Sequence, residues 1–334
     1  MKKSKNIKKL ILKIVLILTI CFSAVFLLSL LINGIITRNQ KEKYGEAYGE
    51  FVETENGRIN YTIIGEGEDV IVMLPGYGSV SPHYEFLELA NELSDTYKMI
   101  IVEPLGYGLS DVTSVERNSE NICKEIHEVL SNIGEDSYYL MGHSIAGLYS
   151  LQYSNMYENE VRGFIGLDAT VPAQIETNDP NQYHIPYNAI KLLYVDTGLM
   201  RMQINMTPDE TYSDPAFKGS MYEVLYKHSA QDRVIIKELL SSVNMNKTAI
   251  NEIKRLKANC EDEMQLKFPE TIPVFYILSK ESVDTDPYWE GYHQDMVKNN
   301  EKGRVEIVEG NHYVHLTNEE KVVELTREWL QDNE

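Results

Sequence analysis

The segment Gly-His-Ser-Ile-Ala-Gly at residues 142–147 places a serine between an apolar run and an amphipathic stretch. The run Tyr-Tyr-Leu-Met at residues 138–141 is typical of a buried strand, and the apolar residues after the segment follow helical spacing. This context predicts a strand, a sharp turn and a helix, with Ser144 at the apex. Such a strained turn needs small residues two positions before and after the serine, and Gly142 and Ala146 meet that need.

Short apolar runs alternate with helical patterns along most of the chain. Runs typical of strands lie at residues 58–64, 69–74, 99–102, 138–141, 161–167, 272–278 and 304–308. Helical spacing occurs at residues 86–93, 122–133, 288–297 and 322–330. Strands that alternate with helices predict a mostly parallel sheet covered by helices on both faces.

The alternation stops between residues 172 and 269. Stretches with helical character, rich in Met and Tyr, lie at residues 187–199, 216–228 and 233–259. An all-helical insertion in a parallel α/β domain is a cap. The sequence therefore predicts a core made of residues 50–171 and 270–334, with a helical cap at residues 172–269.

The N-terminal part of the chain has the composition of a membrane anchor. Residues 1–13 carry six lysines and no acidic residue, and residues 14–37 are uncharged and mostly apolar. At about 1.5 Å per residue this run makes about 36 Å of helix, enough to cross a hydrocarbon core of about 30 Å. A cleaved signal peptide, the alternative, has a shorter apolar region and a small-residue cleavage site. We therefore expect a transmembrane helix at residues 14–37.

Charge predicts the orientation and the partners. The basic segment 1–13 favours a cytoplasmic N-terminus, so the protein is expected in the cell membrane as a single-pass protein with its catalytic domain outside the cytoplasm, after a polar linker at residues 38–49. Without the six lysines the chain has 25 basic and 51 acidic residues, a formal charge of −26. Such an acidic domain is repelled by nucleic acid, so we expect no nucleic-acid partner. Membrane contact is expected through the N-terminal helix.

Three further segments fit acyl-transfer chemistry. Residues 75–79 (Pro-Gly-Tyr-Gly-Ser) follow a predicted strand and offer backbone N–H groups that could hold an oxyanion. His312 lies in a loop after the last predicted strand, where it could act as a general base. Asp168 ends the strand at residues 161–167 and could orient the imidazole and stabilise its charged form.

The order and spacing of these motifs resemble those of alpha/beta-hydrolases with a helical cap, over about residues 50–333. Leu-Pro-Gly-Tyr at residues 74–77 resembles the family's oxyanion loop, which often begins with histidine where Pro75 stands. Glu-Pro-Leu-Gly-Tyr-Gly-Leu-Ser at residues 103–110 resembles its Asp-x-x-Gly-x-Gly-x-Ser segment, and Gly-Asn-His at residues 310–312 its histidine loop. Residues 142–146 match the nucleophile turn.

The resemblance implies roles for individual residues. Ser144 would be the nucleophile and His312 the general base, and the backbone N–H groups of Tyr77 and Ile145 would bind the oxyanion. The implied reaction is hydrolysis of a small-molecule ester, thioester or amide through an acyl-enzyme. It requires no cofactor and no metal.

The acidic member of the triad is left open between three residues. The family usually takes this residue from the loop after the strand at 272–278, where its usual position falls on Ser282. Glu281 and Asp284 lie one and two residues away. Some members use the end of the earlier strand instead, which here is Asp168. We favour Asp168, followed by Glu281 and then Asp284.

Two other histidines receive structural interpretations, and two other functions stay open. His143 is expected to be a packed, hydrogen-bonded neighbour of the nucleophile. His315 lies three residues after His312, but the sequence offers no third ligand, so no metal site is expected.

The alternatives to an esterase-like or lipase-like hydrolase are a proline-releasing aminopeptidase and a catalytically silent hydrolase-fold binding protein. Contact of the cap with a lipid surface is compatible with any of them.

Overall fold

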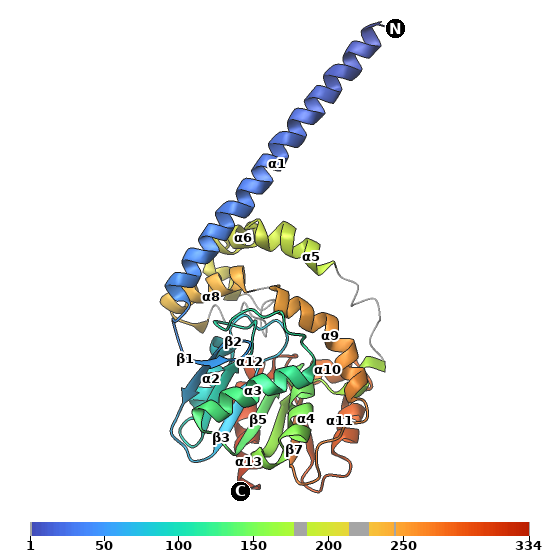
Figure 1. The fold of residues 1–334 in the computed structure, drawn as a ribbon. Coiled ribbons are helices and arrows are strands. Elements are labelled where there is room, and N and C mark those ends of the chain that lie inside the picture. The colour runs from blue at the N-terminus through green and yellow to red at the C-terminus, as the bar shows by residue number, and fades with distance from the viewer. Residues whose placement is uncertain (1, 177–185, 214–226, 244, 334) are drawn as a thin grey trace.

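The computed structural model describes residues 2–176, 186–213, 227–243 and 245–333. An eight-stranded sheet runs through the domain in the order β1-β2-β4-β3-β5-β6-β7-β8 (Figure 1). Its strands are β1 (Glu50–Thr54), β2 (Gly57–Ile64), β3 (Val70–Leu74), β4 (Lys98–Glu103), β5 (Tyr138–His143), β6 (Val161–Leu167), β7 (Val274–Ser279) and β8 (Arg304–Val308). β2 is antiparallel to both of its neighbours, and all other pairs are parallel. The mostly parallel sheet predicted from the alternating pattern is confirmed.

Helices cover both faces of this sheet, so the strands have two buried sides. In β3, Val70, Val72 and Leu74 belong to one core layer, while Ile71 and Met73 belong to the other. The helices of the first layer are α3 (Ser119–Ile133), α4 (Ala146–Met156) and α11 (Trp289–Val297), and those of the second are α2 (Pro82–Leu93) and α13 (Glu319–Gln331). Burial on both sides explains why the central strands are continuous apolar runs.

The described part of the chain between β6 and β7 contains helices and no strand. Its elements are η2 (Pro172–Glu176), α5 (Tyr187–Ile190), the π-helical η4 (Lys191–Asp196), α6 (Leu199–Met206), η5 (Asp209–Ser213), α8 (Ala230–Ser242) and α9 (Lys247–Glu263). The helix expected at residues 216–228 falls almost entirely outside the described residues. The helix expected at 187–199 is divided at Gly198, whose φ of 80° allows a turn before α6 begins.

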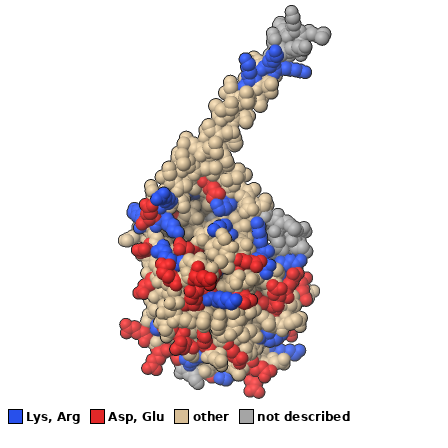
Figure 2. All heavy atoms as spheres, viewed as in Figure 1, with Lys and Arg blue, Asp and Glu red and all other residues tan. Residues whose placement is uncertain are grey.

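A single long helix, α1 (Lys2–Tyr44), projects from the domain (Figure 1). Its apolar part has a mean hydropathy of 2.9 and is long enough to cross a membrane. Figure 2 shows that the length between its basic end and the domain carries no charged side chain, whereas acidic side chains gather on the domain. The helix continues through Tyr44, so the first seven residues of the predicted linker at 38–49 are helical. The end of α1 packs against α8 and η4.

Candidate active site

Ser144 stands at the junction of β5 and α4 with a φ of 52°, in the left-handed region that side chains other than glycine rarely adopt. The surrounding residues permit this turn by their size. A Cβ atom on Gly142 would lie 3.2 Å from Cβ of Ala146, and one on Gly147 would lie 2.3 Å from the backbone oxygen of Thr170. Gly147 therefore contributes to the close packing that the sequence pattern assigned to Gly142 and Ala146. Ser144 itself stays partly exposed.

Ser144, His312 and Asp168 are joined by hydrogen bonds. His312 Nε2 lies 2.9 Å from Ser144 Oγ, and His312 Nδ1 lies 2.8 Å from Asp168 Oδ2. With Nδ1–H donating to the carboxylate, the lone pair of Nε2 faces the serine hydroxyl and can accept its proton. The three residues follow β5, β8 and β6, and the carboxyl ends of parallel strands meet at one edge of the sheet.

The carboxylate of Asp168 is buried, and its oxygens are well supplied with donors. It accepts hydrogen bonds from the Ser279 backbone N–H at 2.9 Å, from Trp289 Nε1 at 2.9 Å and from Ser282 Oγ at 2.5 Å. Burial by itself raises the pKa of Asp168, but the hydrogen bonds from His312 and the other donors outweigh it and lower the pKa below its ordinary value. The carboxylate of Asp168 is therefore ionised where it contacts His312 Nδ1.

The two other candidate acids lie elsewhere on the surface. Both Glu281 and Asp284 are exposed on α10 (Lys280–Thr285). The carboxylate of Asp284 is paired with Lys280. Among the three carboxylates considered from the sequence, the structure brings Asp168 to His312.

The loop after β3 passes directly beside Ser144. A Cβ atom on Gly76 would lie 2.5 Å from His143 Nδ1 and 3.1 Å from Ser144 Cβ, so only glycine fits. Tyr77 follows it, and residues 77–80 line a cavity of about 300 Å³. Ile145 immediately precedes α4, so its N–H group belongs to the positive end of that helix.

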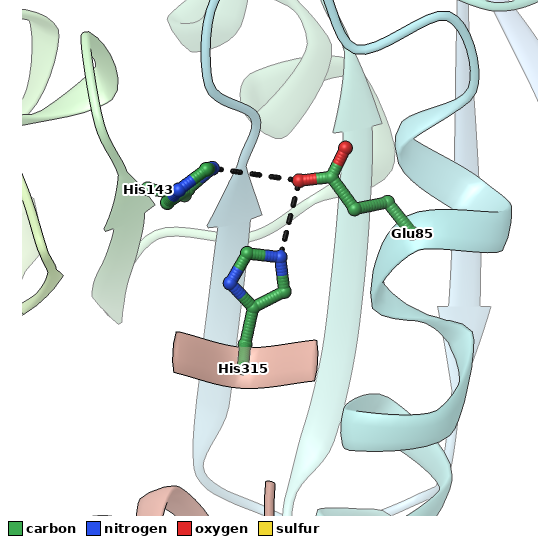
Figure 3. Close-up of side chains that lie close together, drawn as sticks. All are labelled: Glu85, His143 and His315. Atoms are coloured by element: carbon green, nitrogen blue, oxygen red, sulfur yellow. Dashed lines mark hydrogen bonds and ion pairs between the residues drawn. The ribbon is translucent and has the colours of Figure 1, made fainter. Parts of the chain in front are cut away.

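A second polar cluster lies buried below the histidine loop. Figure 3 shows His143 and His315 both directed at the carboxylate of Glu85, which comes from α2. Glu85 Oε1 lies 3.1 Å from His315 Nε2 and 3.5 Å from His143 Nδ1. On its other side, His143 Nε2 lies 3.0 Å from the backbone oxygen of His312. This chain of contacts connects Glu85 to the loop that carries His312.

Charge in this cluster follows from burial and hydrogen bonding. Burial lowers the pKa of His143 to about 4, so its imidazole is neutral near pH 7 and donates from Nε2 to the His312 carbonyl. Burial alone would raise the pKa of Glu85, but the two neighbouring histidines, with His315 Nε2 donating to its carboxylate, hold it below its ordinary range. A neutral His143 then leaves the lone pair of Nδ1 facing an ionised carboxylate.

These three residues are also of the types that bind metal ions. The ligand atoms of Glu85, His143 and His315 lie within 4.8 Å of one another, and zinc is commonly bound by such a set. No third ligand for His315 is evident in the sequence, because Glu85 is 230 residues away along the chain. The imidazoles of His312 and His315 contact different carboxylates, those of Asp168 and Glu85. That the protein holds no metal stays a prediction.

Comparison with known proteins gives one family match. The model of the family described as the alpha/beta hydrolase fold matches residues 69–319. Among curated proteins, YbdG of Bacillus subtilis is 29% identical over 130 residues, which cover 39% of this chain and 40% of YbdG. Proline iminopeptidase of Clostridium botulinum is 28% identical over 138 residues, which cover 39% of this chain and 45% of that protein. The chain thus matches less than half the length of these relatives.

Solved structures show the same fold at low identity. An esterase from Thermogutta terrifontis, solved with malate bound, superposes with a TM-score of 0.62 and 13% identity. The superposition covers 85% of this chain and 99% of the esterase.

Proposed function

The chain belongs to the alpha/beta hydrolase fold family, and we propose that it is a membrane-anchored serine hydrolase that cleaves an ester, thioester or amide. The observation that carries the proposal is the hydrogen-bonded series from Ser144 through His312 to the buried Asp168. An imidazole that is hydrogen-bonded to a partly exposed serine, with an anion behind it, is the arrangement that activates a hydroxyl for attack on a carbonyl.

In the first half of the proposed reaction, Ser144 Oγ attacks the carbonyl carbon as its proton passes to His312 Nε2. The negative charge of Asp168 stabilises the imidazolium that forms. The carbonyl oxygen becomes an oxyanion, which the backbone N–H groups of Tyr77 and Ile145 bind. Each such donor typically contributes about 2.7–4 kcal/mol to the transition state.

In the second half, His312 gives its proton to the leaving group, and the bond between the carbonyl carbon and the leaving group breaks. The acyl group remains on Ser144 as an ester. His312 Nε2 then removes a proton from water as the water oxygen attacks this ester. The bond between the carbonyl carbon and Ser144 Oγ breaks, Oγ takes the proton back from His312, and the acid is released. Every proton moved in the cycle therefore passes through one imidazole nitrogen.

The proposal assigns the rest of the chain to binding and anchoring. The helical segment at 172–269 serves as a cap, because η4, α6 and α8 share an apolar cluster with Val80 of the oxyanion loop and Leu316 after the histidine loop. The core is then residues 50–171 and 270–334. The apolar part of α1 is the membrane anchor, with the lysines cytoplasmic and the domain outside.

Labelling with a fluorophosphonate tests the proposed nucleophile and base. We expect the wild-type protein to be labelled once, the Ser144→Ala variant not at all, and the His312→Ala variant at most weakly. His127→Ala, which alters a partly exposed histidine on α3, is the matched control and should keep wild-type labelling. Labelling of Ser144→Ala at the wild-type level would sink the proposal and favour a catalytically silent binding protein.

A substrate panel separates the esterase from the peptidase. The similarity to a proline iminopeptidase favours one specific alternative, a proline-releasing aminopeptidase. We expect faster hydrolysis of acyl esters than of prolyl amides with a free amino group. A kcat/KM more than tenfold higher for the prolyl amide would support the peptidase instead.

Anchoring is tested separately with the full chain in cells. We expect the protein to stay with membranes after high-salt and carbonate washes, and a protease added outside the cell to reach the domain. Recovery of a soluble form that begins near residue 38 would instead identify a cleaved signal.

A further inference from the structure

We propose that the part of the cap at residues 187–206, called here the cap edge, lies in the membrane leaflet next to α1 and draws a lipid acyl ester from that leaflet toward Ser144. The inference rests on the proposed hydrolase function and anchor, and it adds the class of substrate. The partner that covers the apolar surface of the cap edge is the lipid bilayer itself.

The cap edge has an apolar outer surface. Six large apolar side chains on it are 37–74% exposed. They are Ile190, Leu192, Leu193, Leu199, Met202 and Met206. In a chain with a formal charge of −20, residues 187–206 contain a single acidic residue, Asp196, and this residue is paired with Lys191. Such a patch on a soluble surface marks a site of protein or membrane contact.

Hydrogen bonds attach the cap edge to α1. Asn33 Nδ2 donates to the backbone oxygens of Val195 at 3.0 Å and Asp196 at 3.1 Å, and Arg201 Nε donates to Asn33 Oδ1 at 3.0 Å. A Cβ atom on Gly198 would lie 3.0 Å from Asn33 Oδ1, so glycine lets the turn approach the helix closely. Asn33 is the one polar amide in the apolar run at 14–37, and it is 7% exposed.

The position of Asn33 in α1 sets the depth of the cap edge. A hydrocarbon core of about 30 Å takes about 20 helical residues at about 1.5 Å each, so a core that begins at Ile14 ends near Asn33. The cap edge is therefore attached where α1 leaves the hydrocarbon. The half-buried side chains of α1 continue deeper at helical spacing, at Phe26, Ser29 and Leu30. Figure 1 shows α6 beside this part of α1.

Two adjacent cavities lie between α1, the start of the cap edge and the oxyanion loop. The cavity of about 300 Å³ next to Tyr77 is also lined by Tyr187, at the start of the cap edge. A neighbouring cavity of about 200 Å³ is lined by Thr37 and Lys41 of α1 and by Ile235, Glu238 and Leu239 of α8. Gly106 and Val243 line both cavities, so the two are adjacent. An acyl chain that leaves the leaflet beside α1 thus meets a mostly apolar lining up to the oxyanion loop.

The test uses the full chain reconstituted in phosphatidylcholine vesicles. Its activity on a long-chain acyl ester embedded in the vesicle is compared with its activity on a water-soluble short-chain ester. The test variant is Leu193→Glu/Met202→Glu, and the matched control is Ile307→Glu, which places a charge at an exposed apolar position on β8. We expect the ratio of the two kcat/KM values, embedded over soluble, to fall more than tenfold in the test variant and to stay at the wild-type value in the control.

A second measurement locates the cap edge without catalysis. Tryptophan fluorescence of Leu193→Trp should be quenched by brominated phosphatidylcholine, and that of Ile307→Trp should not. An unquenched Leu193→Trp, or an unaltered ratio in Leu193→Glu/Met202→Glu, overturns the inference even if the soluble ester is hydrolysed. Absence of both fluorophosphonate labelling and soluble-ester hydrolysis in the wild type would instead overturn the proposed function.

Discussion

The hydroxyl of Ser282 donates a 2.5 Å hydrogen bond to the carboxylate of Asp168. Ser282 is the position at which the family resemblance expects the acidic residue of a triad. In this chain, position 282 instead carries a hydroxyl that donates to Asp168, and this acidic residue follows the neighbouring strand β6. The two side chains thus meet behind His312, with the carboxylate after β6 and its hydrogen-bond donor after β7.

The first prediction concerns Asp168 alone. Asp168→Asn should keep the fold but lower kcat by about 10⁴-fold, as in the best-studied protease triad, because an amide can favour the wrong tautomer of His312. Glu281→Gln and Asp284→Asn should stay within a few-fold of wild type, since both carboxylates are exposed. Steady-state kinetics decide, with melting temperatures as the check on folding. A large loss in Glu281→Gln beside a nearly active Asp168→Asn would transfer the role to Glu281.

The second prediction exchanges the acid and its donor. Because Ser282 Oγ reaches Asp168 Oδ2, a carboxylate at 282 can occupy nearly the same place behind His312. The double variant Asp168→Ser/Ser282→Asp should therefore recover at least tenfold in kcat over Asp168→Ser. The control Asp168→Ser/Ser282→Asn has the same size without the charge and should recover nothing. Equal rates for the two double variants would mean that the anion at 282 does not reach the imidazole.

The sequence predicted those parts of the molecule that repeat a local pattern. Both faces of the central strands are buried, so their apolar runs were visible without any tertiary information. The strand β1, with the sequence Glu-Phe-Val-Glu-Thr, was missed because it is short and only one of its residues is fully buried. At the site, Ser144, His312 and Asp168 could be proposed because each ends or follows a recognisable strand.

Residues that act across the sheet could not be found in this way. Glu85 reads as an ordinary polar residue of an amphipathic helix, and its partners lie 58 and 230 residues further on. Trp289 donates to Asp168 from 121 residues away. No spacing rule connects such positions, because tertiary packing alone brings them together.

The third prediction tests the stability that Glu85 contributes. Glu85→Ala removes the acceptor of a buried His315 and leaves that N–H without a partner. Breaking a buried pair costs about 3 kcal/mol or more, and each kcal/mol shifts the Tm of a domain of this size by roughly 2–4 °C. We expect Tm to fall by roughly 6–12 °C by these magnitudes. Glu92→Ala, on the exposed side of the same helix, should change Tm little. A wild-type Tm for Glu85→Ala would contradict the assigned role.

The fourth prediction concerns metal content. The hydrogen bond to Glu85 accounts for His315 Nε2 without an ion, and the proposed reaction needs none. We expect elemental analysis of the purified full chain to find less than one metal ion per ten chains. Dialysis against a chelator should leave fluorophosphonate labelling and Tm unaltered. A stoichiometric metal that is lost in His315→Ala, together with a drop in Tm on chelation, would identify Glu85, His143 and His315 as ligands.

The fifth prediction is a pH dependence of stability due to Glu263 at the end of α9. Burial raises the pKa of this carboxyl from its ordinary value of 4.5 to about 8. Between these values the folded state keeps a proton that the unfolded state has released, so the free energy of unfolding decreases as the pH rises.

Glutamine at position 263 cannot ionise, so it removes this contribution. Glu263→Gln should therefore gain Tm relative to wild type on going from pH 5 to pH 8, as measured by thermal unfolding at both values. Glu261→Gln, exposed on the same helix, should track the wild type at both pH values. A Glu263→Gln difference that is the same at pH 5 and pH 8 would show that Glu263 is ionised in the folded protein throughout.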